Sequence, residues 1–181
     1  MRQTEYVILG LLSESPLTGY QIKRTIDLRF RFFWNESYGQ LYPTLKSLSD
    51  RGLIEEQAMF VKEGRAQKTY CIKPEGFKEL RNWLEQPVER ESLRLEILLK
   101  MYFSNLVAAE TMIGHIETFN KSHQKDLQWL KQARSELEQV LDQHPNHPYI
   151  LRVVDFGIKV NKAYLKWSRE TIEFLKSEAS K

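Results

Sequence analysis

Residues 37–54 decide the fold of this chain, and they read SYGQLYPTLKSLSDRGLI. Leu41, Leu45 and Leu48 recur at intervals of four and three residues, so a helix would carry them on one narrow face. The opposite face has small and hydrogen-bonding side chains, which suit a helix that enters a groove of DNA. Gly52 suits the C-terminal turn of that helix. On these residues alone an ordinary amphipathic helix fits equally well, so the neighbouring segments have to decide.

The sequence before this stretch predicts two more helices joined by a turn. Thr4 is a suitable N-cap for a helix over residues 4–14, whose apolar side chains lie close together. Residues 15–19, SPLTG, predict a turn, and residues 20–30 resume helical spacing. A short aromatic connection follows, and we expect it to seal a core or an interface through Phe32, Phe33 and Trp34.

The sequence after residue 54 predicts a β-hairpin with a basic tip. Residues 55–76 read EEQAMFVKEGRAQKTYCIKPEG, two extended segments joined by a polar turn around Gly64. Pro74 then opens a fourth helix. Three helices followed by a hairpin form a winged helix-turn-helix, whose third helix enters the major groove and whose wing reaches the flanking backbone. The expected fold class is therefore α+β, mainly α with a small β-hairpin.

A polar, proline-containing segment at residues 86–91 interrupts the helical periodicity and marks a domain boundary. We expect a DNA-binding domain at 1–87 and a helical domain at 88–181. The second domain shows only helical patterns, at residues 93–103, 108–144 and 149–175. The last two predict long antiparallel helices with little of their own chain to cover their apolar faces. Their partner is expected to be a second copy, which gives a homodimer.

Composition predicts a folded protein, and the charge has to be judged segment by segment. The chain has 181 residues, 41% of them hydrophobic, which is ample for a packed core. Its formal net charge is only +3, so an argument for nucleic acid has to rest on local charge. Residues 23–31 and 57–73 each hold four basic residues against one acidic residue. Double-stranded DNA is the expected partner of these segments.

The remaining residue types point to an intracellular, non-enzymatic protein. A single cysteine, Cys71, excludes an intramolecular disulfide and a zinc site made of cysteines. No apolar run is long enough for a secretion signal or a membrane span, so we expect a cytoplasmic protein without a membrane partner. His144 and His147 lack a third ligand nearby and indicate a polar loop rather than a metal site. We expect no cofactor, and no nucleophile and base occur in a recognised catalytic motif.

The central stretch also resembles a known family. Residues 37–54, preceded by LTGYQI at 17–22 and followed by KTYCIKPEG at 68–76, are similar to the PadR family of bacterial transcriptional regulators. The C-terminal part is similar to the larger subgroup of that family, which includes a phenolic-acid-responsive repressor. The residues that carry this likeness are Leu98, Lys100, Tyr102 and Phe103, with Trp167 in the closing helix. The resemblance implies a homodimeric repressor that binds an inverted repeat. It also implies that a small aromatic or hydrophobic molecule can release the DNA.

The resemblance assigns candidate DNA contacts by position. The positions that match DNA-facing residues of the family are Tyr20, Ser37, Gln40, Tyr42 and Lys46, whereas Arg65 and Lys68 match the wing by location only. Gln40 has the chemistry to pair with adenine, and Lys46 can reach a guanine edge or a phosphate. Lys62 joins Arg65 and Lys68 as a phosphate contact on the wing. A solvated turn explains each wing cation equally well, and a core position explains Tyr20 nearly as well.

Aromatic residues of the second domain are candidates for an effector pocket. A flat ligand could lie between helices against Phe103, Trp129, Phe156, Tyr164 and Trp167. The competing interpretation places these side chains in the core or in the dimer interface. For the whole chain, the alternative function is a protein-interaction module built on a winged-helix scaffold, without a DNA target.

Overall fold

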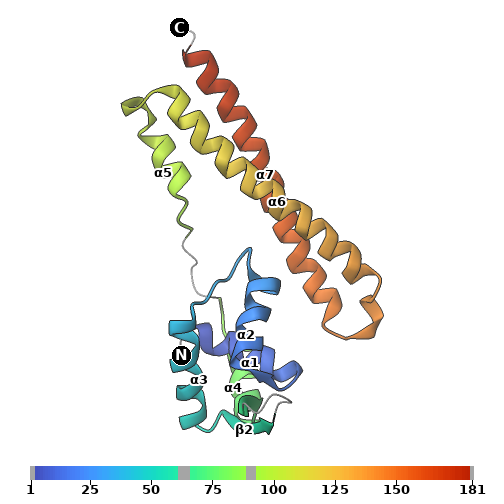
Figure 1. Ribbon diagram of the computed structural model, residues 1–181. Coiled ribbons are helices and arrows are strands. Elements are labelled where there is room, and N and C mark those ends of the chain that lie inside the picture. Colours follow the sequence, from blue (N-terminus) through green and yellow to red (C-terminus); the bar gives the residue numbers. More distant parts are fainter. Residues whose placement is uncertain (1–2, 61–65, 89–92, 180–181) are drawn as a thin grey trace. The chain divides into compact units, whose positions relative to one another are not determined.

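The computed structural model describes residues 3–60, 66–88 and 93–179, and the chain divides into two compact units, Met1–Arg90 and Glu91–Lys181 (Figure 1). Lys62 and Arg65 lie outside the described residues. In the described part of the chain, no helix is both long enough and apolar enough to cross a membrane.

The first unit has the expected order of helices followed by a sheet. Its elements are α1 (Gln3–Glu14), β1 (Leu17–Thr18), α2 (Gly19–Thr25), the π-helical turn η1 (Ile26–Phe30), α3 (Tyr38–Asp50), β2 (Ile54–Phe60), β3 (Ala66–Ile72) and α4 (Pro74–Glu85). The expected winged-helix fold class, mainly α with a small β structure, is confirmed.

Two details of the first helices differ from expectation. Thr4 lies inside α1 rather than at its N-cap, and its hydroxyl donates to the carboxyl of Glu36. The single helix expected over residues 20–30 is α2 followed by η1. Thr18 begins α2 with a capping box, because its side chain accepts from the Gln21 amide while the Gln21 side chain accepts from the Thr18 amide.

The sheet contains one strand more than the expected hairpin. Its order is β1-β3-β2, and both pairings are antiparallel. Leu17 pairs with Tyr70, and Ile54 pairs with Ile72. The segment expected to be only a turn thus supplies β1, because two of its residues are extended next to β3. This pairing joins the start of α2 to the wing.

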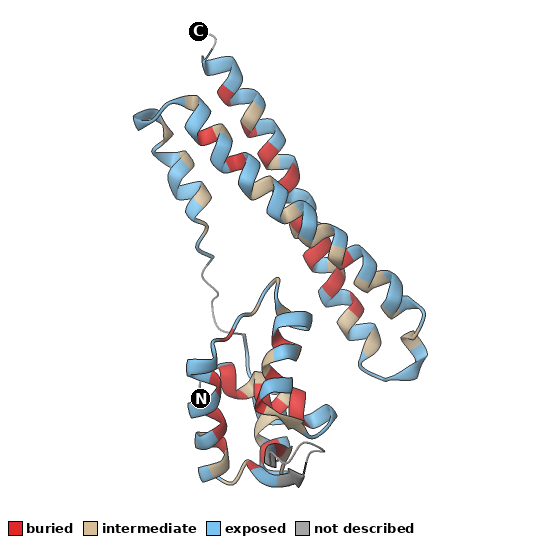
Figure 2. Ribbon diagram, viewed as in Figure 1, coloured by how far each residue is buried: buried red, intermediate tan, exposed pale blue. Residues whose placement is uncertain are grey.

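The core of this unit lies where α1, α2 and α3 meet the sheet (Figure 2). The predicted stripe of α3 is fully buried, since Leu41, Leu45 and Leu48 are each 0% exposed. Ile8 and Leu9 of α1 are buried to the same degree. At 25 cal/mol per Å² of apolar surface, burying such a side chain contributes about 2 kcal/mol. The stripe therefore fixes which face of α3 is turned outward.

The second unit is entirely helical in its described residues. Its elements are α5 (Glu96–Tyr102), η2 (Ser104–Leu106), α6 (Ala109–Glu138), η3 (Leu141–Gln143) and α7 (His147–Ala179). The helices α6 and α7 run antiparallel and pack along each other, as expected (Figure 1). A hydrogen bond of 2.8 Å between His123 of α6 and Asn161 of α7 connects them. The Asn161 side chain is 4% exposed and also donates to the Gly157 carbonyl within α7.

The predicted bounds of the second unit need correction. The expected helix at residues 93–103 begins only at Glu96, because Leu95 is extended. The helix expected to run to residue 144 ends at Glu138, and a short 3₁₀ turn follows. Conversely, α7 begins at His147 rather than residue 149, since proline at position 148 is tolerated in the first turn of a helix.

Candidate nucleic-acid interface

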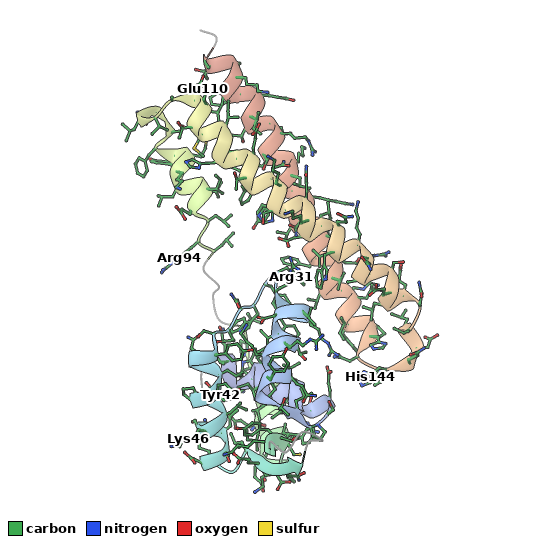
Figure 3. All side chains as sticks on the ribbon, in the orientation of Figure 1. Arg31, Tyr42, Lys46, Arg94, Glu110 and His144 are labelled. Atoms are coloured by element: carbon green, nitrogen blue, oxygen red, sulfur yellow. The ribbon has the colours of Figure 1, made fainter. Side chains whose placement is uncertain are left out.

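The outward face of α3 carries polar side chains that are open to solvent. Ser37, Gln40 and Lys46 are exposed, and Tyr42 is 49% exposed. Tyr42 and Lys46 both extend from α3 (Figure 3). The Ser37 hydroxyl lies 3.4 Å from the Gln40 side-chain oxygen, so the two polar groups lie together at the start of the helix. These groups can donate to and accept from base edges or phosphate oxygens.

Aromatic contacts hold Tyr42 in place at the junction of α2 and α3. Its ring stacks on Tyr38, with centroids 6.2 Å apart and planes 16° apart. A Cβ atom added to Gly19 would lie 2.8 Å from the Tyr42 ring, so only glycine allows this approach. The Lys23 ammonium lies 5.4 Å from the Tyr38 ring centroid, within range of a cation–π interaction. Tyr20, near the start of α2, is 60% exposed.

Both ends of α3 are defined by backbone geometry. Pro43 lies inside α3 and lacks the amide that would bond to a preceding carbonyl, which favours an irregular turn. The helix instead continues unbroken through Pro43. At the other end Gly52 has a φ of +70°, and the Leu53 amide donates to the Leu48 carbonyl at 2.9 Å. This is the glycine-dependent end predicted from the sequence.

Several basic residues that the sequence offered to DNA have acidic partners. Lys68, which is 67% exposed, lies 2.8 Å from Glu56 on the neighbouring strand. The hydrogen bond and the charge of Glu56 raise the pKa of Lys68 above its usual value. Arg29 pairs with Glu14 at 2.8 Å, and Lys23 pairs with Asp27. These ion pairs partly neutralise the basic residues that the segments would present to DNA.

The predicted effector residues fall into separate places in the second unit. Tyr164 and Trp167 of α7 both contact Phe119 of α6, with ring centroids 5.5 and 5.9 Å apart. Trp129 is half-buried in α6, and Phe156 is 62% exposed in α7. The structure thus brings together two of the five predicted side chains, through an aromatic residue outside the predicted set.

Two open cavities adjoin α5 within this unit. One of about 350 Å³ is mostly apolar and is lined by Leu99, Phe103 and Met112 among others. The other, of about 390 Å³, includes Phe119 in its wall together with polar and charged side chains, among them Arg94 and Ser122. Phe103 therefore belongs to the first cavity, and the Tyr164–Trp167 contact lies next to the second through Phe119.

Sequence reasoning missed two residues near α3. Tyr38 is 47% exposed and precedes Tyr42 by one helical turn, a spacing that could have revealed it. Glu36 is only 6% exposed and accepts bonds from Thr4 and Trp34. A glutamate at the end of the aromatic connection gives no sequence signal of its own burial. Among the described residues, no group of histidine, cysteine and acidic side chains could hold a metal ion.

Comparison with known proteins places the chain among transcriptional regulators. Residues 8–82 match the "Transcriptional regulator PadR-like family", and residues 93–176 match "Virulence activator alpha C-term". The negative transcriptional regulator PadR of Bacillus subtilis is 34% identical over 112 residues, a region that spans 61% of this chain and 61% of that protein.

Two solved structures of that regulator extend the likeness over nearly the whole chain. B. subtilis PadR in complex with operator DNA is 26% identical with a TM-score of 0.84, covering 97% of this chain and 98% of that one. Its complex with p-coumaric acid is 26% identical with a TM-score of 0.73, covering 97% and 99%. These relatives are transcriptional regulators rather than enzymes, and the resemblance drawn from residues 17–76 is confirmed. Residues 8–82 of the chain therefore belong to the PadR-like family of transcriptional regulators.

Proposed function

We propose that this regulator is a homodimeric repressor that reads an inverted-repeat operator through α3 and is released by a small aromatic effector. The observation that carries the proposal is the two-sided build of α3. Its leucine stripe is 0% exposed, while Ser37, Gln40 and Lys46 face solvent. The likeness to a PadR structure in complex with operator DNA supports DNA as the partner.

Each candidate side chain has a role that follows from its chemistry. Gln40 pairs with an adenine edge, and Lys46 contacts guanine or phosphate. The hydroxyls of Tyr20, Ser37 and Tyr42 donate to phosphate oxygens and set the register of the helix on DNA. The wing adds phosphate contacts through three cations, Lys62, Arg65 and Lys68.

The second copy is needed for both affinity and symmetry. We propose that residues 1–87 bind DNA and that residues 88–181 form the dimer. A strip from α5 to the residue after η2 leaves large apolar side chains open, with Tyr102 81%, Leu106 76% and Leu99 61% exposed. Contiguous apolar patches of this kind mark interaction surfaces. Two linked copies reach adjacent major-groove half-sites, and the second contact is then intramolecular.

The effector is a small aromatic molecule, and the second unit offers places for its ring. Support comes from the likeness to PadR bound to p-coumaric acid and from the aromatic side chains beside the two cavities. We propose that Phe103 contributes at the first cavity and that Tyr164 and Trp167 contribute beside the second. Trp129 and Phe156 are further candidates outside both linings. The effector lowers DNA affinity only by the difference in its own affinity for the two dimer arrangements.

A gel-shift titration on the DNA upstream of the protein's own coding sequence tests the proposal. The expected result is a sequence-selective complex that weakens steeply as salt rises, since phosphate contacts release counterions. Failure to prefer that DNA over a scrambled duplex, together with no effect of salt, would contradict it.

A further inference from the structure

Two side chains in one turn of α1 form hydrogen bonds at the two ends of α3. At the start, the Thr4 hydroxyl donates to the Glu36 carboxyl at 2.6 Å, one residue before the N-cap Ser37. At the end, the guanidinium of Arg51, the C-cap residue, donates to the Glu5 carboxylate at 2.8 Å. Thr4 and Glu5 are consecutive and each is 8% exposed. Two adjacent side chains of α1 therefore hold the two ends of one helix.

The carboxyl of Glu36 is an unusual group to place in this position. It is 6% exposed, and one of its oxygens accepts from both the Thr4 hydroxyl and the Trp34 indole, the latter at 3.0 Å. Burying a carboxyl is unfavourable unless hydrogen bonds compensate it. Trp34 itself packs against the core of the unit. A buried carboxyl therefore lies just before α3, at a position where packing alone would need only an apolar side chain.

Apolar packing and hydrogen bonds constrain α3 in different ways. The stripe of Leu41, Leu45 and Leu48 turns one face inward, but hydrophobic contact has no preferred direction. It leaves α3 free to rock and slide slightly against α1. Hydrogen bonds have a defined length and angle, so bonds at both ends remove that freedom. Reading base edges needs side chains held to within about 0.5 Å.

We propose that Glu36 and the Glu5–Arg51 ion pair are positioning residues for sequence reading. They hold α3 at the angle that presents its outer face to the major groove, and they do not touch DNA themselves. This proposal rests on the proposed function, because it concerns how accurately α3 reads DNA. Their loss lowers the preference for the correct sequence, whereas binding to arbitrary DNA stays the same.

Thr4→Val and Thr4→Ser form the matched pair that tests the link at the start of α3. Valine keeps the shape of threonine but removes the donor to Glu36, whereas serine keeps the hydroxyl. The probes are the duplex that the wild-type protein enriches most strongly from a random-sequence pool and a scrambled duplex of the same composition. We expect Thr4→Val to lower the ratio of the two affinities about tenfold, the discrimination that one misplaced base contact removes. Thr4→Ser should keep the wild-type ratio.

A second variant tests the proposal at the other end of α3 if Thr4→Val folds poorly. Arg51→Gln breaks the link at the other end, where the arginine side chain is 40% exposed, and Arg51→Lys keeps the charge. Ile54→Val is the control for lost packing in the same unit, since Ile54 is 1% exposed. The control should leave the ratio unchanged.

The possible outcomes separate this proposal from the proposed function. A wild-type protein that enriches no sequence overturns the proposed function and this inference with it. A selective wild-type protein whose ratio survives Thr4→Val and Arg51→Gln overturns only the positioning role. Equal losses on both duplexes also overturn it, because they indicate stability rather than orientation.

Discussion

Gln40 is the side chain whose loss should change sequence preference most. Because an amide can donate to and accept from one adenine edge, Gln40→Ala should weaken binding to the selected operator by ~1 to 3 kcal/mol. Binding to scrambled DNA should change little, since the side chain makes no phosphate contact in this arrangement. Fluorescence anisotropy on both duplexes measures the difference.

A matched glutamine is available in the second unit. Gln132 lies in α6 and donates to Glu136 at 2.9 Å, so Gln132→Ala removes the same side chain away from α3. It should leave both affinities unchanged. Equal losses for Gln40→Ala on operator and scrambled DNA would remove this residue from the reading role.

The Glu56–Lys68 pair on the wing should act on all DNA alike. Glu56→Gln removes a negative charge 2.8 Å from the Lys68 ammonium, so binding should strengthen on every sequence. Lys68→Ala should weaken binding on every sequence and lower the salt slope by about 1. Lysine is protonated at neutral pH, and Glu56 raises the pKa of Lys68 further, so the effect of Lys68 should not vary between pH 6 and 8. Titrations at several salt concentrations check these points, and a sequence-dependent effect of Lys68→Ala would contradict them.

For single residues, the sequence predicted the roles that follow from helical spacing. The leucines at 41, 45 and 48 and the glycine at 52 depend only on neighbours along the chain. The partners of Lys68 and Glu36 come from other elements, Glu56 across the sheet and Thr4 in α1. A sequence pattern carries no information about contacts between distant elements. The count of basic residues therefore overstated the unpaired positive charge of the wing.

The close contact between the start of α4 and the backbone just before β2 depends on Gly76. A Cβ atom added there would lie 2.2 Å from the Leu53 carbonyl oxygen, which belongs to the backbone and has little room to move. Gly76→Ala should therefore destabilise the first unit by about 3 kcal/mol or more. Thermal unfolding followed by circular dichroism measures the loss.

Gly10 provides the matched control for this substitution. It lies within α1, and a Cβ atom added there meets nothing within 4 Å. Gly10→Ala should be neutral or stabilising, by up to ~1 kcal/mol, since alanine is the better helix former. The expectation for the α4 junction is wrong if the two alanine variants unfold at the same temperature.

The elements themselves divide into those with local signals and those without. Residues 37–54 predicted α3 because periodicity, the outer face and the terminal glycine agree. The two-residue strand β1 had no pattern of its own, since its extended form depends on pairing with β3. Likewise, Leu93 and Leu95 do not belong to α5, although leucine suits a helix.

For the whole molecule, a charge in the apolar strip should separate the two copies. Leu106 is 76% exposed, and Leu106→Glu would place a carboxylate in a desolvated interface. Sedimentation velocity should show a dimer for the wild-type protein and a shift toward monomer for the variant.

Val88 belongs to the first unit, follows α4 and is 87% exposed, so a glutamate there places the same charge outside the apolar strip. Val88→Glu should keep the wild-type sedimentation. A Leu106→Glu protein that stays dimeric at micromolar concentration would show that the strip from α5 to η2 is not the interface.

Selection of bound duplexes from a random-sequence pool, by wild-type protein and by Gln40→Ala, tests whether α3 reads the operator. The wild type should enrich an inverted repeat whose half-sites are centred about one helical turn apart. Gln40→Ala should lose the preference at one symmetric pair of positions and keep the rest. No enriched sequence, or a wild-type preference that Gln40→Ala reproduces at every position, would contradict the claim that α3 reads the operator.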